Sequence, residues 1–201
     1  PTKFPKRVLN EVDLIQEPNY NIESKKRKDF RSTTTFTIDP HDAKDFDDAI
    51  SISFLPSGHT EIGVHIADVG HYVKPDSYLD KEAFLRANSV YLVDRVIPML
   101  PERLSNELCS LRPKEDKLTF SAVFELNDEC QVISRWFGKT VIHSNHRFTY
   151  EEAQDIIEGK DGPFKDELLK VNQLAQKCRS SRLSNGALNV KSSEVRFRLD
   201  E

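Results

Sequence analysis

The ten residues Asp39–Asp48 (D-P-H-D-A-K-D-F-D-D) have side chains and a spacing suited to binding a cation. They include five aspartates and one lysine, so their charge is −5 + 1 = −4, equal to the formal net charge of the 201-residue chain. Carboxylates this close repel one another unless a cation lies among them. Their oxygens are hard ligands that suit Mg²⁺ and Mn²⁺, and metal-bound carboxylate clusters activate water against phosphodiesters. This acidic run therefore indicates a metal site with hydrolytic chemistry.

Strand-forming residues flank the acidic run on both sides. Residues 33–38 (T-T-T-F-T-I) place Phe36 and Ile38 on one face by period two, and residues 49–54 (A-I-S-I-S-F) alternate in the same way. The pattern predicts a strand, an acidic loop and a second strand. Rigid flanks of this kind would hold the carboxylates in fixed relative positions, as a metal site requires. The alternative is a solvated acidic turn without a ligand.

The spacing does not fit a calcium-binding EF-hand loop. If such a loop began at Asp45, its third position would be Asp47, but its fifth would be Ala49. The sixth position requires glycine and the twelfth glutamate, yet Ile50 and Pro56 stand there. A calcium-stabilised structural domain is therefore a weaker hypothesis than a magnesium site.

Further short motifs follow along the chain, and together they resemble a known family. They are T-F-T-I-D-P (35–40), D-A-K-D-F-D-D-A (42–49), I-G-V-H-I-A-D-V (62–69), S-V-Y-L (89–92), R-V-I-P-M-L-P (95–101), L-S-N-E-L-C-S-L (104–111), V-I-H-S (141–144) and R-F-T-Y-E-E-A (147–153). In this order they resemble the ribonuclease II / ribonuclease R (RNB) exoribonucleases, with bacterial ribonuclease R the nearer branch. The resemblance extends from about Phe4 to the last residue.

The resemblance implies a function and roles for particular residues. It implies Mg²⁺-dependent 3′→5′ hydrolysis of single-stranded RNA from its 3′ end, releasing nucleoside 5′-monophosphates, with Mn²⁺ as a possible substitute. Asp39, Asp45 and Asp48 match the residues associated with metal binding, and Asp47 matches the residue needed for cleavage. Tyr91 matches a tyrosine that helps to hold the last bases, a role that suits the sequence-tolerant stacking of aromatic rings. Without the resemblance, Tyr91 reads as an ordinary strand residue.

The resemblance also implies how the chain is organised. Residues 29–201 match the N-terminal half of an RNB-type catalytic domain, and residues 1–28 read as a leading segment or linker. A later T-S-P-I-R-R-Y-like motif, which supplies arginine to the family's active site, does not occur. Neither do the family's cold-shock and S1 RNA-binding domains. We therefore expect a fragment of a monomeric parent enzyme. A non-catalytic module that binds RNA or a partner remains the alternative.

Composition and charge exclude several other classes of protein. The sequence pI of about 5.9 argues against a general nucleic-acid-binding protein. Lys25–Lys28 is the densest basic run, either a solvated linker or an approach for phosphates, and Arg95, Arg103 and Arg112 are further candidates for RNA contacts. No apolar run approaches the roughly 20 residues of a membrane span. The three cysteines are widely spaced, which predicts neither a zinc ribbon nor a disulfide but reduced thiols in a cytoplasmic protein.

The remaining pattern predicts an α+β fold, a mixed and mainly antiparallel sheet with helices packed against it. Residues 61–73 read as a strand in which His65 is a satisfied, semi-buried histidine. Residues 78–88 read as a helix with Leu79, Ala83, Phe84 and Ala87 on its apolar stripe. We expect a hairpin of 118–126 and 132–142, a helix from the capping box Thr149/Glu152 to about 158, a helix from 163 to 185, and a last strand around Val195, Phe197 and Leu199.

Overall fold

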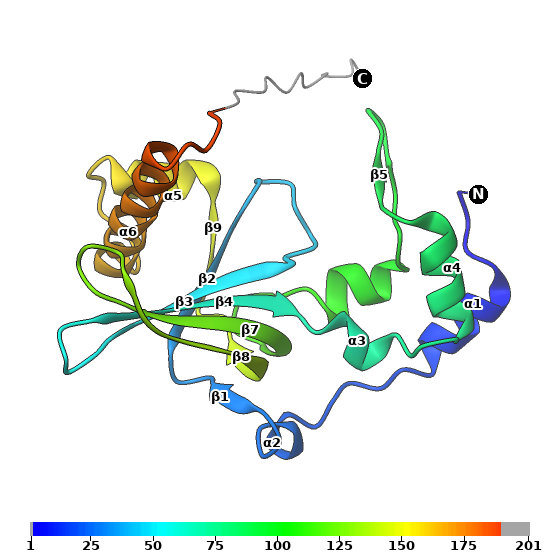
Figure 1. Cartoon of the computed structure of the whole chain (residues 1–201). Coiled ribbons are helices and arrows are strands. Elements are labelled where there is room, and N and C mark those ends of the chain that lie inside the picture. The colour runs from blue at the N-terminus through cyan, green and yellow to red at the C-terminus, as the bar shows by residue number, and fades with distance from the viewer. Residues whose placement is uncertain (1, 190–201) are drawn as a thin grey trace.

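The computed structural model describes residues 2–189, and the strand expected around Val195–Leu199 lies outside them. The chain forms one large mixed sheet with helices at its end and on one face (Figure 1). The elements in chain order are α1 (Lys6–Asp13), α2 (Tyr20–Glu23), β1 (Lys28–Phe30), β2 (Thr34–Asp39), β3 (Asp48–Phe54), β4 (Thr60–Ala67), α3 (Val69–Tyr72), α4 (Tyr78–Arg86), β5 (Val90–Tyr91), β6 (Val96–Ile97), the short π-helix η1 (Arg103–Leu108), β7 (Asp116–Leu126), β8 (Val132–His143), β9 (His146–Thr149), α5 (Tyr150–Ile157) and α6 (Lys165–Ser184).

The sheet has seven strands in the order β1-β8-β7-β4-β3-β2-β9. The four inner pairings are antiparallel, whereas β1 joins β8 and β9 joins β2 in parallel. A separate small hairpin of β5 and β6 extends from the α4 end of the molecule (Figure 1). The predicted α+β fold with a mixed, mainly antiparallel sheet is confirmed.

Two apolar clusters hold the molecule together. One packs α5 and α6 over the β2–β9 end of the sheet, where Phe36, Phe148 and Leu168 are fully or almost fully buried. The other joins α1, α3, α4 and η1 at the end of the sheet, and it buries Val8 and Val12 of α1. Part of the expected leading segment therefore packs into the core, which anchors the chain before the sheet begins.

The sheet face against which α5 and α6 pack extends beyond these helices. A large part of this extension is apolar and exposed. It is formed by Val64 and Ile66 on β4, Phe120 on β7 and Phe137 on β8. Register places Asp48 opposite Ile66 and Ile66 opposite Phe120, so all three share this face. Exposed apolar patches of this kind mark interaction surfaces. The first residue of β3 therefore borders an apolar surface.

The structure confirms the two strands around the acidic run, the β7–β8 hairpin, and the capping box in which Thr149 and Glu152 bond reciprocally. The long helix also forms, from Lys165 to Ser184. The expectation for 61–73 is wrong in its second half, because β4 ends at Ala67 and α3 follows. These local features form where the apolar periodicity and the capping residues favour the same secondary structure.

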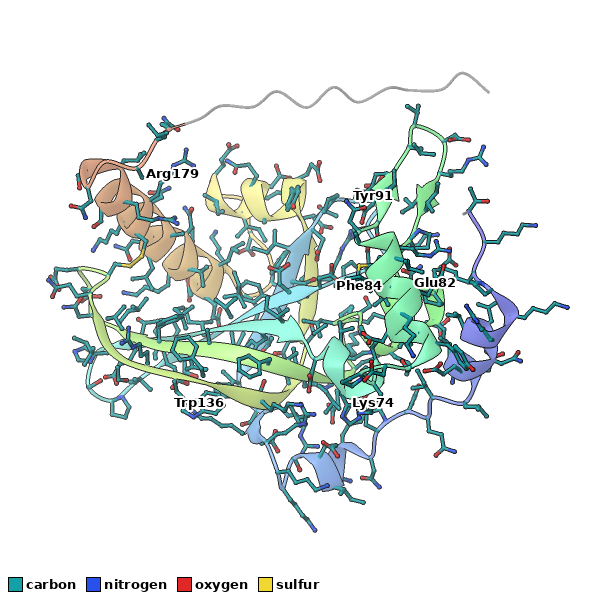
Figure 2. The ribbon with its side chains drawn as sticks, turned by 45° about the vertical axis from the view of Figure 1, so that its right-hand side comes forward. Lys74, Glu82, Phe84, Tyr91, Trp136 and Arg179 are labelled. Carbon is teal, nitrogen blue, oxygen red and sulfur yellow. A yellow bond between two sulfur atoms is a disulfide. The ribbon has the colours of Figure 1, made fainter. Side chains whose placement is uncertain are left out.

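The apolar stripe expected on α4 is only partly correct. Leu79 and Ala83 are buried, but Phe84 is 84% exposed and so faces solvent (Figure 2). The helix runs from Tyr78 to Arg86, and Ala87 ends it with a positive φ of 67°. A short helix at the edge of the domain needs only a narrow buried stripe. The pattern of four apolar residues therefore predicted a wider buried face than α4 has.

Cys130 and Cys178 form a disulfide, contrary to the expected reduced thiols. Cys130 lies in the turn between β7 and β8, and Cys178 lies on α6, 48 residues later. Only Cys109 remains a free thiol in the described part of the chain, and it is buried. The sequence could not show this pairing, because no local pattern brings the hairpin turn against α6. Within residues 2–189, no helix is long and apolar enough to cross a membrane.

We predict that one cysteine, Cys109, will react with a thiol-alkylating reagent in the denatured, non-reduced protein, and three after reduction. Closing a loop of 48 residues stabilises a fold by about 4 kcal/mol at 25 °C in the chain-entropy description. Reductant should therefore lower the unfolding free energy of the protein but leave that of the Cys178→Ser variant unchanged. Alkylation of all three cysteines without reductant would contradict the pairing.

His65 gives a second, pH-dependent prediction. The side chain is completely buried and shares hydrogen bonds with Ser121 (2.6 Å) and Ser51 (2.8 Å), as expected of a satisfied histidine. Burial lowers its pKa from 6.5 to about 4. Between these two values the unfolded chain binds the proton more tightly than the folded chain, so folding stability decreases as the pH falls.

We expect this residue to account for about 3 kcal/mol of lost stability between pH 6.5 and pH 4. The measurement is urea unfolding at several pH values for the protein and for His65→Asn. The variant should be less stable at neutral pH but should show a flatter decline in acid. Parallel declines in the two proteins would contradict a neutral buried imidazole.

Candidate functional site

The acidic residues lie at the junction of two neighbouring strands. Asp39 is the last residue of β2 and Asp48 is the first residue of β3, so the sheet holds the backbone of both. The connecting residues 40–47 belong to no helix or strand, and they carry Asp45 and Asp47. This acidic loop rises from the sheet in Figure 1 on the side that also carries α5. The predicted order of strand, acidic loop and strand is confirmed.

The acidic loop is anchored to the core between its carboxylates. The side chain of Phe46 packs against the core cluster at the end of the sheet, which leaves the flanking Asp45 and Asp47 outside it. The carbonyl oxygen of Phe46 accepts a hydrogen bond from the amide of Leu111 at 2.8 Å. The carbonyl of Asp47 accepts one from Ala67 at 3.0 Å. The backbone is therefore fixed at Phe46 and at Asp47, although the loop has no regular structure.

The negative charges of the acidic loop are only partly compensated by neighbouring groups. Asp39 is only 8% exposed, and its Oδ2 atom is buried without a hydrogen-bond partner. Burial raises the pKa of Asp39, and repulsion from Asp48 and Asp45 adds to the effect. The pKa of Asp47 is raised by partial removal from water and then by Asp45, Asp48 and Asp39. The carboxylates of the four predicted site residues therefore lie close enough to interact electrostatically.

This arrangement of carboxylates suits a hard cation, but the side chains do not form a complete set of metal ligands. An unpartnered buried carboxylate oxygen and mutually repelling neighbours would both be stabilised by a divalent ion. Among residues 2–189, however, no three His, Cys, Asp or Glu side chains are arranged to hold a metal. The assignment of Asp39, Asp45 and Asp48 as ligands therefore stays a prediction.

Tyr91 reaches the acidic loop from the β5–β6 hairpin. Its hydroxyl donates to Oδ2 of Asp45 across 3.4 Å, a distance at the long end for a hydrogen bond. Its ring is 67% exposed, and Figure 2 shows it on the projecting hairpin. Partial burial and then the charge of Asp45 raise the pKa of Tyr91. The structure therefore brings together the five residues predicted from the sequence.

Arg147 is a residue of this site to which sequence analysis gave no role. Its Nη2 atom donates to the carbonyl oxygens of Pro40 (2.5 Å) and His41 (3.0 Å), at the start of the acidic loop. Its guanidinium carbon lies 5.5 Å from the ring centroid of Phe46, within the range of a cation–π contact. Its positive charge also partly opposes the rise in the pKa of Asp39. Arg147 is thus a cation built into the base of the loop.

The position of Arg147 follows from strand pairing across a long sequence separation. β9 runs parallel to β2, with Arg147 beside Thr37 and Thr149 beside Asp39. The R-F-T-Y motif marked the segment, but nothing local to either strand indicates that they are neighbours. One signal was available in the sequence. Arg147 is a basic residue two positions before the helix-capping Thr149, and it lies in one of the motifs of the same family as the acidic run.

Two of the other basic candidates for RNA contacts are engaged in the fold away from the acidic loop. Arg103 donates to the carbonyls of Val12 and Ile15 and so ties η1 to α1. Arg27, in the basic run, is almost buried and pairs with Asp68 at 2.7 Å, so it is not part of a solvated linker. Asp68 also forms an ion pair with Lys139 at 3.2 Å. Arg103, Arg27 and Asp68 therefore stabilise the fold at the end of the sheet.

Comparison with known proteins identifies the family. Residues 27–201 match the RNB domain. The chain belongs to the RNB exoribonuclease family. Ribonuclease R of Thermotoga maritima is 44% identical over 207 residues, which cover all of this chain and 29% of that protein. A protein of Arabidopsis thaliana named "Inactive exonuclease DIS3L2" is 44% identical over 195 residues, 89% of this chain and 18% of that protein.

Solved structures agree with this RNB assignment. RNase R of Mycoplasma genitalium, determined in complex with ribose methylated single-stranded RNA, superposes with a TM-score of 0.90 at 27% identity. The match covers 99% of this chain and 32% of that chain. The chain thus spans less than a third of the length of these relatives. The predicted resemblance to the RNB family, and to ribonuclease R within it, is confirmed.

We predict that Arg147→Met destabilises the protein by about 2 to 3 kcal/mol, because it deprives two carbonyl groups of a charged donor. Urea unfolding monitored by circular dichroism measures this. Arg95→Met is the control, since Arg95 is exposed and pairs with its neighbour Asp94. That variant should change stability by less than about 0.5 kcal/mol. Equal effects of the two substitutions would show that Arg147 does not anchor the loop.

Proposed function

We propose that this chain provides the acidic, metal-binding part of a 3′→5′ exoribonuclease that hydrolyses single-stranded RNA to nucleoside 5′-monophosphates. The observation that carries the proposal is the convergence of Asp39, Asp45, Asp47 and Asp48 with the hydroxyl of Tyr91. Membership of the RNB family supplies the reaction class. A carboxylate cluster beside an exposed aromatic ring suits a site that cuts a phosphodiester next to a stacked base.

In this proposal Asp39, Asp45 and Asp48 hold Mg²⁺, for which Mn²⁺ can substitute. When bound, the ion supplies positive charge at the scissile phosphate and beside the water that attacks it. The carboxylate of Asp47 orients that water or accepts its proton. A bond then forms between the water oxygen and phosphorus, the bond to the 3′ oxygen breaks, and a nucleoside 5′-monophosphate leaves.

Tyr91 would position the 3′ end of the RNA. Its hydroxyl is held by Asp45, which leaves the exposed ring available to stack on a base at the edge of the acidic loop. Stacking does not depend on the base, so this contact suits an enzyme of broad sequence specificity. The structures of Mycoplasma genitalium RNase R with ribose methylated single-stranded RNA and with double-stranded RNA support RNA as the partner. We propose a monomeric parent enzyme of the cytoplasm.

A non-catalytic RNA-binding or partner-binding module is the second candidate. Two observations favour it for this chain. The acidic side chains do not form a group of three metal ligands within the described residues, and one close relative is named as an inactive exonuclease. The convergence of Asp47, Asp48 and Tyr91 at one loop favours the nuclease.

We predict that Asp47→Asn abolishes cleavage, with a loss of at least about 100-fold, but leaves RNA affinity close to that of the unaltered protein. The assay is shortening of 5′-labelled oligoadenylate from its 3′ end with Mg²⁺ or Mn²⁺, beside filter binding of the same RNA. Asp42→Asn is the matched control, since Asp42 is an exposed carboxylate of the same loop without an assigned role.

The outcomes separate the two candidates. A metal-dependent ladder from the unaltered protein and Asp42→Asn, absent with Asp47→Asn, supports the nuclease. Equal loss of RNA affinity and cleavage in Asp47→Asn would contradict its role in the chemical step. RNA binding without cleavage by all three proteins would favour the non-catalytic module for this chain.

A further inference from the structure

A single buried hydroxyl contacts the acidic loop on both sides of Asp45. The Oγ atom of Ser110 accepts a hydrogen bond from the backbone N–H of Phe46 at 3.0 Å. It donates to the backbone carbonyl oxygen of Lys44 at 3.0 Å. Ser110 is completely buried, and it lies in the segment that follows η1. One side chain thus pairs a donor and an acceptor of the loop that flank one proposed metal ligand.

These bonds do the work that a neighbouring strand does elsewhere in the sheet. Residues 40–47 have no strand partner, so their backbone groups need other partners when they lie against the core. The amide of Leu111 adds a third bond to the carbonyl of Phe46, directly beside the two bonds of Ser110. The segment 110–111 therefore acts as a short substitute strand for the middle of the loop.

The support for Ser110 is rigid. Its neighbours Cys109 and Leu111 are 4% and 0% exposed and belong to the core cluster at the end of the sheet. Phe46 packs against the same cluster, so the loop and its support share one apolar foundation. Functional groups must be held within about 0.5 Å of their working geometry by such supporting contacts. Ser110 is well placed for this role, because it is completely buried between two buried neighbours.

We propose that Ser110 is a positioning residue that fixes Asp45 and Asp47 for cation binding. The proposal rests on the proposed function, since it assumes that the acidic loop takes a divalent ion. Ser110 itself contacts neither ion nor RNA in this proposal. It acts through the backbone of Lys44–Phe46, and its loss lets the loop carboxylates drift apart under their own repulsion. Residues that orient metal ligands in this way change metal affinity by about 10- to 100-fold.

The test measures Mn²⁺ binding directly, by the loss of the free-ion signal in electron paramagnetic resonance, together with urea unfolding. Three proteins are compared: the unaltered chain, Ser110→Ala, and Ser121→Ala. Ser121 is the matched control, because it is equally buried and bonds to His65 and Thr140 but does not contact the loop. Both variants should lose stability. Only Ser110→Ala should bind Mn²⁺ about 10-fold or more weakly.

The result that overturns the inference is equal Mn²⁺ affinity of Ser110→Ala and the unaltered protein. A similar weakening in Ser121→Ala also overturns it, because general destabilisation would then explain the change. If the unaltered chain binds no Mn²⁺ while it is folded, the proposed metal site fails and this inference fails with it. Should Ser110→Ala fail to fold, Ser110→Cys replaces it, with a thiol of similar size that hydrogen-bonds weakly, and the same outcomes decide.

Discussion

Repulsion among the carboxylates between β2 and β3 is the constraint on which the rest of this structure depends. Two unit charges about 4 Å apart interact by about 4 kcal/mol at an effective dielectric constant near 20. A flexible loop would relieve this repulsion by spreading. Here Asp39 and Asp48 are held at strand ends, and Phe46 fixes the middle of the loop in the core. Arg147 adds a positive charge at its base.

The anchors of the loop come from distant parts of the sequence. Leu111 follows the irregular η1 region, Ala67 ends β4, and Arg147 lies on β9. They lie in different parts of the fold, at or between different elements of the domain. The structure of the acidic loop therefore depends on contacts with several separate parts of the domain. Its geometry is a property of the domain and not of the ten-residue motif.

This dependence explains what could be predicted from the sequence and what could not. Alternating residues such as Phe36 and Ile38 predict their strand, and Thr149 with Glu152 predicts its helix start, because both signals are local. The acidic residues were recognisable by their composition and by family motifs. The exposure of Phe84 was not, because an amphipathic pattern does not say how wide a stripe its neighbours will cover.

Long-range relations account for the remaining errors and omissions. The disulfide of Cys130 and Cys178 joins a hairpin turn to a helix, and the parallel pairing of β9 with β2 places Arg147 at the loop. Neither relation leaves a periodic trace in the sequence. The metal-binding roles of Asp39, Asp45 and Asp48 are a separate case, because they rest on the family motif and on uncompensated charge instead of a formed coordination shell.

Thr149 links the helical layer to the acidic loop through a single residue. It ends β9 opposite Asp39, and its hydroxyl also caps α5 by accepting the amide of Glu152. The start of α5 thus stabilises the register of β9 against β2, and this register also positions Arg147, two residues before Thr149. The start of α5 is therefore part of the support of the acidic loop. Substitutions of Thr149 or Glu152 would weaken this helix start and, with it, the register that places Arg147 at the acidic loop.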